Sequence, residues 1–156
     1  NRAGERAVEK GFSQVLWLDA LQHKYVEEGG GMNVMFKIAG KVVTPMLTGS
    51  ILDGITRRSC IAMLKSWGMP VEERLISVDE LVQAAENGTL EEAWCVGTAA
   101  VISPIGEISY HDKPYVINDF KIGETSQMLY DRLTGLQWGK EPDPFGWTDP
   151  LPRKQA

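Results

Sequence analysis

The chain has 156 residues and a formal net charge of −5 at pH 7. This length fits one domain with a sizeable core, and the acidic balance argues against nucleic-acid binding, which needs a basic stripe. No apolar run is long enough to cross a membrane, and the charged, helix-like first ten residues are unlike a signal peptide. The two cysteines, Cys60 and Cys95, are isolated, which is typical of a reducing cytoplasm.

In the first half of the chain, apolar periodicity and turn residues predict a mixture of helices and strands. In chain order they are a helix over residues 2–10, a strand over 12–18, a hairpin of strands 33–38 and 41–44, a helix over 54–67 and a strand over 71–76. Ala39-Gly40 supplies the hairpin turn, and Gly68-Met69-Pro70 ends the second helix.

The second half begins with a helix that opens at Ser77, where Glu80 three residues later completes a capping box. The further elements are an inner strand over 93–105 interrupted by Gly97, short strands over 107–110 and 115–117, and a helix over 123–138 with Met128, Leu129, Leu133 and Leu136 facing inward. The tail, residues 139–156, carries four prolines and is expected to lie extended on the surface. Strands and helices mix without strict alternation, which predicts an α+β fold.

The stretch Gly54-Ile55-Thr56 places a helix start directly after a glycine. The first backbone N–H groups of a helix have no intrahelical partner and carry partial positive charge, and the Thr56 hydroxyl adds a donor. These residues can form a phosphate cup. The alternative is an ordinary helix start with Asp53 as N-cap, whose carboxylate would repel a phosphate unless it points away.

Two further stretches have related chemistry. Gly97-Thr98-Ala99, at the end of an apolar strand, either offers backbone N–H groups and a hydroxyl to a ligand or is a β-bulge. Glu28 precedes three glycines and is either a solvated carboxylate or a partner for a cationic nitrogen. His23 and His111 lie far apart without ligand spacing, so we predict no metal site.

The order of these segments resembles the branched-chain amino-acid aminotransferases, which are pyridoxal-phosphate enzymes of fold type IV. The resemblance rests on Gln14–Asp19, Glu28–Asn33, Thr44–Arg57 and Gly97–Ala99, and it continues to Gly146-Trp147-Thr148. It implies that residues 1–156 are the C-terminal large domain of such an enzyme, in which mixed sheets form a pseudo-barrel flanked by helices. It also implies pyridoxal 5′-phosphate as the cofactor.

The resemblance assigns roles at the matching positions. Glu28 matches the carboxylate that faces the pyridine nitrogen and keeps it protonated. Leu52 matches the apolar residue packed on the ring face. Gly54, Ile55 and Thr56 match the turn and the helix start that bind the phosphate.

The other matching positions lie in the third stretch. Thr98 matches a further phosphate donor, and the backbone N–H groups of Thr98 and Ala99 match those that receive the α-carboxylate of the substrate. The implied reaction moves the amino group of leucine, isoleucine or valine to 2-oxoglutarate. The implied assembly is a cytoplasmic homodimer.

The family's Schiff-base lysine has no match in this chain, since Lys10, Lys24 and Lys37 fall outside the motif. The resemblance therefore implies a truncated large domain, without the small domain, that is inactive on its own. Alternatives are another fold type IV enzyme, such as a D-amino-acid aminotransferase or an aminodeoxychorismate lyase, and a non-enzymatic oligomerising domain. Asp53 stands where many relatives carry proline, so the turn chemistry there can differ.

Overall fold

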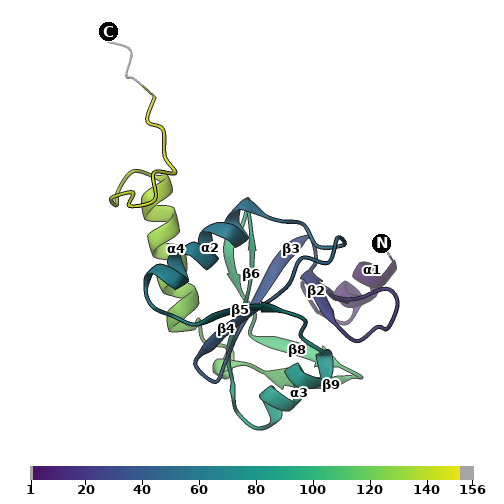
Figure 1. Ribbon diagram of the computed structural model, residues 1–156. Helices are drawn as coiled ribbons and strands as arrows, with labels where there is room; N and C mark the ends of the chain where they lie inside the picture. Colours follow the sequence, from purple (N-terminus) through teal and green to yellow (C-terminus); the bar gives the residue numbers. More distant parts are fainter. Residues whose placement is uncertain (1, 152–156) are drawn as a thin grey trace.

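The computed structural model describes residues 2–151, so residues 152–156 of the predicted tail lie outside the described part. Helices and strands alternate irregularly along the chain (Figure 1). In order they are α1 (Arg2–Glu9), β1 (Leu16–Leu18), β2 (Val26–Gly29), β3 (Met32–Ile38), β4 (Lys41–Pro45), α2 (Ile55–Ser66), β5 (Val71–Arg74), α3 (Val78–Glu86), β6 (Leu90–Gly97), β7 (Val101–Pro104), β8 (Glu107–Tyr110), β9 (Lys113–Val116), the 3₁₀ helix η1 (Asn118–Phe120) and α4 (Glu124–Gln137).

A seven-stranded sheet organises the fold, and β3 is its central strand. One edge of β3 pairs with β6, while its other edge pairs first with β2 and then with β4. All these pairs are antiparallel, and only the β4–β5 pair is parallel. The strands β8 and β9 form a separate two-stranded sheet. Together with the four α-helices found within residues 2–151, this mixture of pairings confirms the predicted α+β class.

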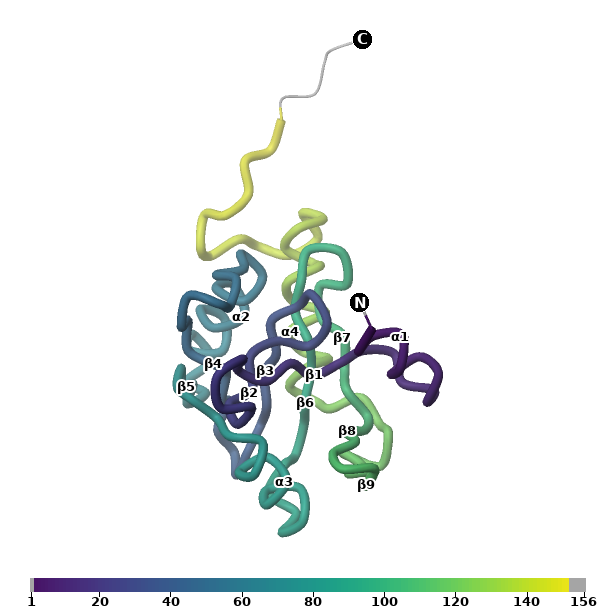
Figure 2. Tube along the Cα trace, turned by 90° about the vertical axis from the view of Figure 1, so that its right-hand side faces the viewer, coloured from purple at the N-terminus to yellow at the C-terminus, as the bar shows by residue number. Residues whose placement is uncertain are grey.

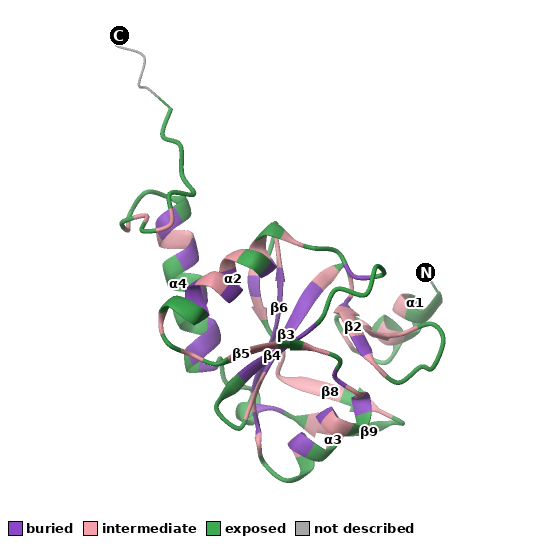
Figure 3. Ribbon diagram, in the orientation of Figure 1, coloured by how far each residue is buried: buried purple, intermediate pink, exposed green. Residues whose placement is uncertain are grey.

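Each face of the sheet carries a hydrophobic core. Successive side chains of β3 point to opposite faces and so alternate between the two cores. Met35 packs with residues of α2 and α4 on one face, whereas Val34 and Phe36 pack with residues of α3 on the other. Trp94 of β6 is fully buried in the first core. Buried residues therefore run along the sheet strands and the inner sides of α2, α3 and α4, whereas α1 has none (Figure 3).

Three details of the predicted elements are wrong. The strand expected over 12–18 contains only Leu16–Leu18, because the preceding residues fold back on α1, where Phe12 N donates to the Ala7 carbonyl. The single strand expected over 93–105 is the antiparallel pair β6 and β7, joined at residues 98–100. Met128 is 36% exposed, because it lies beside the buried Leu129–Leu133–Leu136 stripe of α4 rather than within it.

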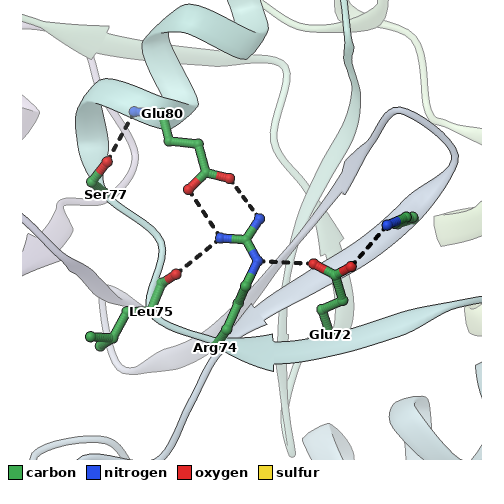
Figure 4. Close-up of polar contacts among 6 residues, drawn as sticks. Glu72, Arg74, Leu75, Ser77 and Glu80 are labelled. Atoms are coloured by element: carbon green, nitrogen blue, oxygen red, sulfur yellow. Dashed lines mark hydrogen bonds and ion pairs between the residues drawn. The ribbon is translucent and has the colours of Figure 1, made fainter.

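The capping box predicted at Ser77 forms only in part. Ser77 Oγ accepts a hydrogen bond from Glu80 N at 3.1 Å, so the helix α3 begins where the sequence indicates. The Glu80 side chain does not turn back to Ser77. It instead makes a bidentate contact with Arg74, which also donates to Glu72 (Figure 4). This contact ties the start of α3 to β5.

Candidate functional site

The three stretches singled out in the sequence converge on one end of the sheet. Because β6 runs antiparallel to β3, the β6–β7 turn lies beside the β2–β3 turn, and Asn33 pairs with Val96. Because β4 also runs antiparallel to β3, residues 46–54 leave the sheet at this same end before entering α2. In Figure 2, α2 and this end of the sheet lie on the side of the folded body from which the C-terminal tail leaves. The topology therefore places Glu28, the start of α2 and Thr98 near one another.

Glu28 makes direct contact with the loop that leads into α2. Its Oε1 accepts a hydrogen bond from the Leu52 backbone N–H at 3.0 Å. The neighbouring Glu27 holds the same loop, because its Oε1 accepts from Ser50 Oγ at 2.5 Å. The geometry anchors one oxygen of the Glu28 carboxylate, so its other oxygen can accept a hydrogen bond from a ligand.

The helix α2 begins without a side-chain cap. Gly54 is its N-cap residue, so the alternative of Asp53 as N-cap is wrong. The Asp53 carboxylate lies 3.6 Å from Arg58 Nε, so its negative charge is paired with the guanidinium of Arg58. The backbone N–H groups of Ile55 and Thr56 belong to the first turn, where no intrahelical acceptor exists. An anion at this point would meet these N–H groups, the Thr56 hydroxyl and the positive end of the helix.

The remaining predicted residues frame this helix start with exposed surface. The Leu52 side chain is 70% exposed and that of Ile55 is 68% exposed. Thr98 and Ala99 are also exposed, in the turn that joins β6 to β7. This turn excludes the β-bulge alternative, since Gly97 pairs directly with Val101. Apolar side chains and a small-residue turn therefore border the carboxylate and the helix start.

Two buried polar residues behind this surface were not singled out in the sequence. Asn33 is 5% exposed, and its Nδ2 donates to the Leu52 carbonyl at 2.8 Å. Arg57 is 2% exposed, and its Nη2 donates at 3.0 Å both to the Pro45 carbonyl and to Glu73. Nothing in a local pattern distinguishes them, although both belong to stretches that carry the family resemblance.

A cavity lies in another part of the fold. It measures about 1030 Å³, and α1, β1 and β8 line it together with Gly29 and Cys95. None of the predicted site residues lines it, and Cys95 belongs to the core on the α3 face of the sheet. The exposed Leu52, Ile55, Thr98 and Ala99 make the candidate site open surface. Within residues 2–151, no group of three His, Cys, Asp or Glu side chains could hold a metal ion.

The chain belongs to the amino-transferase class IV family, whose family model matches residues 1–108. Among curated relatives, it is 57% identical over 147 residues to branched-chain-amino-acid aminotransferase 2 of Bacillus subtilis. That match covers 94% of this chain and 40% of the relative. A branched-chain-amino-acid aminotransferase of Mycolicibacterium smegmatis is 44% identical, with 93% and 40% covered. The chain therefore spans about two fifths of the length of these relatives.

Solved structures show the same fold. The branched-chain amino acid aminotransferase from Escherichia coli superposes with a TM-score of 0.77 at 29% identity, covering 94% of this chain and 45% of that one. An aminotransferase of the same name from T.th. matches with the same TM-score, identity and coverage, and it was crystallised with N-(5′-phosphopyridoxyl)-L-glutamate. The fold type IV class expected from the sequence is confirmed.

Proposed function

We propose that this chain is the cofactor-binding part of a longer branched-chain amino-acid aminotransferase, called the parent protein below. The parent uses pyridoxal 5′-phosphate to transfer the amino group of leucine, isoleucine or valine to 2-oxoglutarate. The names and 44–57% identities of the curated relatives support this assignment. The observation that carries it is the contact of Glu28 with Leu52, two residues before the uncapped start of α2.

The residues at this end of the sheet fit the chemical groups of the cofactor. A phosphate suits the first N–H groups of α2 and the Thr56 hydroxyl, and Thr98 adds a second hydroxyl. A protonated pyridine nitrogen suits Glu28, the carboxylate with one oxygen already anchored. An aromatic ring suits the exposed side chain of Leu52, the residue whose backbone N–H binds Glu28. Donors, acceptor and apolar surface thus match one small ligand.

When bound, the cofactor supplies an electron sink that accepts the electron pair released at the substrate Cα. Glu28 would hold a proton on the ring nitrogen, because its negative charge stabilises the cationic form. Thr56 and the α2 start would hold the phosphate and so fix the ring against Leu52. The backbone N–H groups of Thr98 and Ala99 would orient the substrate through its α-carboxylate. The lysine that bonds to the cofactor and the small domain are proposed to lie outside this chain.

The activity test compares the parent protein with this chain alone. The parent with added cofactor should transaminate leucine, isoleucine and valine, with 2-oxoglutarate as acceptor, at a higher kcat/KM than D-alanine. The isolated chain should show no turnover, because Glu28 and Thr56 can hold the cofactor but cannot replace the missing lysine. Preference of the parent for D-alanine, or cleavage of aminodeoxychorismate, would favour the other fold type IV activities.

We further propose that the parent is a cytoplasmic homodimer. Both cysteines of the chain are buried free thiols, as is common in a reducing compartment. No helix within residues 2–151 is long and apolar enough to cross a membrane. Light scattering on the parent protein tests the dimer, and a monomeric mass would contradict it.

A further inference from the structure

Asn33 is a buried amide at the start of the central strand β3. Its side chain is 5% exposed, so its polar atoms need protein partners. The Nδ2 group donates to the Leu52 carbonyl at 2.8 Å. This bond assigns the amide orientation and directs Oδ1 toward Gly54, where an added Cβ would lie 2.4 Å from it.

Both backbone polar groups of Leu52, its N–H and its C=O, bind side chains from a single pair of opposite residues in the β2–β3 sheet pairing. Glu28 and Asn33 are directly opposite partners in the β2–β3 pair, so their side chains share one face about 5 Å apart. Glu28 accepts the Leu52 N–H at 3.0 Å, and Asn33 donates to the Leu52 carbonyl. The distance between the carboxylate and the loop is therefore fixed by the sheet, not by the loop itself.

Gly54 is required for space and not for backbone conformation. Its φ of −66° and ψ of 138° are accessible to any L-residue. Its N–H donates to the Leu52 carbonyl at 2.9 Å, the same oxygen that Asn33 binds. The start of α2 thus presses against the Asn33 amide, with no room between them for a methyl group.

On the other side of β3, Asn33 lies beside β6, the strand that leads into the Thr98-Ala99 turn. Its register partner in β6 is Val96, two residues before Thr98. Asn33 therefore adjoins Glu28 through β2, the α2 start through Leu52 and Gly54, and the Thr98 turn through β6. We propose that Asn33 is a positioning residue that sets the phosphate-binding start of α2 at its working distance from Glu28.

This proposal rests on the proposed function, since the two groups must span one cofactor. The chemistry of the side chain explains the choice of residue. Aspartate would lose the donor to Leu52 and place a second negative charge beside Glu28. Alanine would leave the Leu52 carbonyl with Gly54 N alone and open space behind the turn. Either change lets the α2 start move relative to Glu28.

The test measures binding of two probes to the parent protein, pyridoxine 5′-phosphate and pyridoxine, by calorimetry. Neither probe carries an aldehyde, so neither bonds to lysine, and their affinity ratio reports the phosphate cup. The variants are Asn33→Ala, Gly54→Ala and the double variant. Thr44→Val is the matched control. It removes a buried side-chain hydrogen bond between β4 and β3, from Thr44 Oγ1 to the Val34 carbonyl at 2.8 Å, which is not one of the two bonds from Glu28 and Asn33 to Leu52.

Asn33→Ala and Gly54→Ala should each lower the affinity ratio about tenfold, the loss of roughly one charge-assisted hydrogen bond. The double variant should be no weaker than Asn33→Ala alone within about threefold, because the amide oxygen that the new methyl group would strike is gone. Thr44→Val should lower Tm but keep the ratio.

An unchanged ratio in Asn33→Ala, with a Tm loss like that of Thr44→Val, would reduce the amide to a structural role and overturn the proposal. If Asn33→Ala does not fold, Gly54→Ala decides by the same criterion. Wild-type protein that binds both probes equally would contradict the proposed function itself, and the inference would fall with it.

Discussion

The carboxylate of Glu92 offers a sharp test of how the sheet holds α4. Glu92 lies on β6 and is 6% exposed. Its Oε1 accepts from Thr125 N and its Oε2 from Ser126 N, both at 3.0 Å. These residues form the first turn of α4, which has no cap from its own N-cap side chain. Glu92 thus neutralises the positive end of a helix more than thirty residues away in sequence.

Glu92→Gln should destabilise the protein by about 2–3 kcal/mol at pH 7. The change removes the charge from two hydrogen bonds and turns an NH₂ group toward a backbone donor. For a chain of this size the loss corresponds to a fall in Tm of about 5–10 °C. Urea unfolding followed by tryptophan fluorescence measures the free energy. Glu124→Gln, the same change at an exposed site in the first turn of α4, should cost less than about 1 kcal/mol.

The pH dependence of this difference tests the electrostatic reasoning. Burial raises the pKa of Glu92, but the N–H groups of Ser126 and Thr125 outweigh it and hold the pKa below its ordinary value of 4.5. A lowered carboxyl pKa stabilises the fold above about pH 4.5, and this stability is lost as the pH falls through the folded-state pKa. The gap between wild type and Glu92→Gln should therefore shrink on acidification. A gap that is absent at pH 7, or constant down to about pH 3.5, would refute the reasoning.

Three further outcomes follow from other contacts. Arg57→Met should cost about 2–4 kcal/mol in urea unfolding, because it leaves the Pro45 carbonyl without its buried donor; a loss under about 0.5 kcal/mol would count against that role. Asp19→Ala should speed amide exchange at Tyr25, because the Tyr25 N–H loses the carboxylate that accepts its hydrogen bond. N–H groups of the same loop, that of Tyr25 foremost, lower the pKa of Asp19 to about 2. Unchanged exchange would show that the loop is stable without this carboxylate. Thr56→Val should weaken pyridoxal phosphate binding about tenfold in the parent protein, and equal affinity would remove the hydroxyl from the phosphate cup.

The sequence predicted elements whose signals are local. The Ala39-Gly40 turn and the Ser77 cap lie where turn and capping residues indicate, and α2 begins directly after Gly54, as the sequence predicted. It failed where a nonlocal contact decides. The apolar run over residues 93–105 predicts one strand interrupted at Gly97, yet the chain reverses after Gly97 because β7 pairs back on β6.

The candidate site likewise contains residues that local motifs predicted and residues that only nonlocal contacts reveal. The motif order identified Glu28 and the α2 start, since each carries recognisable chemistry in a short stretch. It gave no signal for Asn33, whose partners are the loop residues Leu52 and Gly54. It also missed the burial of Arg57 and the capping of α4 by Glu92, because both depend on strand register and helix docking.

The most direct test of the central claim compares Glu28→Gln with Glu27→Gln in the parent protein. Each variant removes one charge but keeps an oxygen that can accept the hydrogen bond from the loop, Leu52 N for position 28 and Ser50 Oγ for position 27. Glu28→Gln should lower kcat for leucine about ten- to hundredfold, the loss of one charge-assisted hydrogen bond, while Glu27→Gln stays within about twofold. Equal rates for the two variants would contradict the assignment of Glu28 to the ring nitrogen.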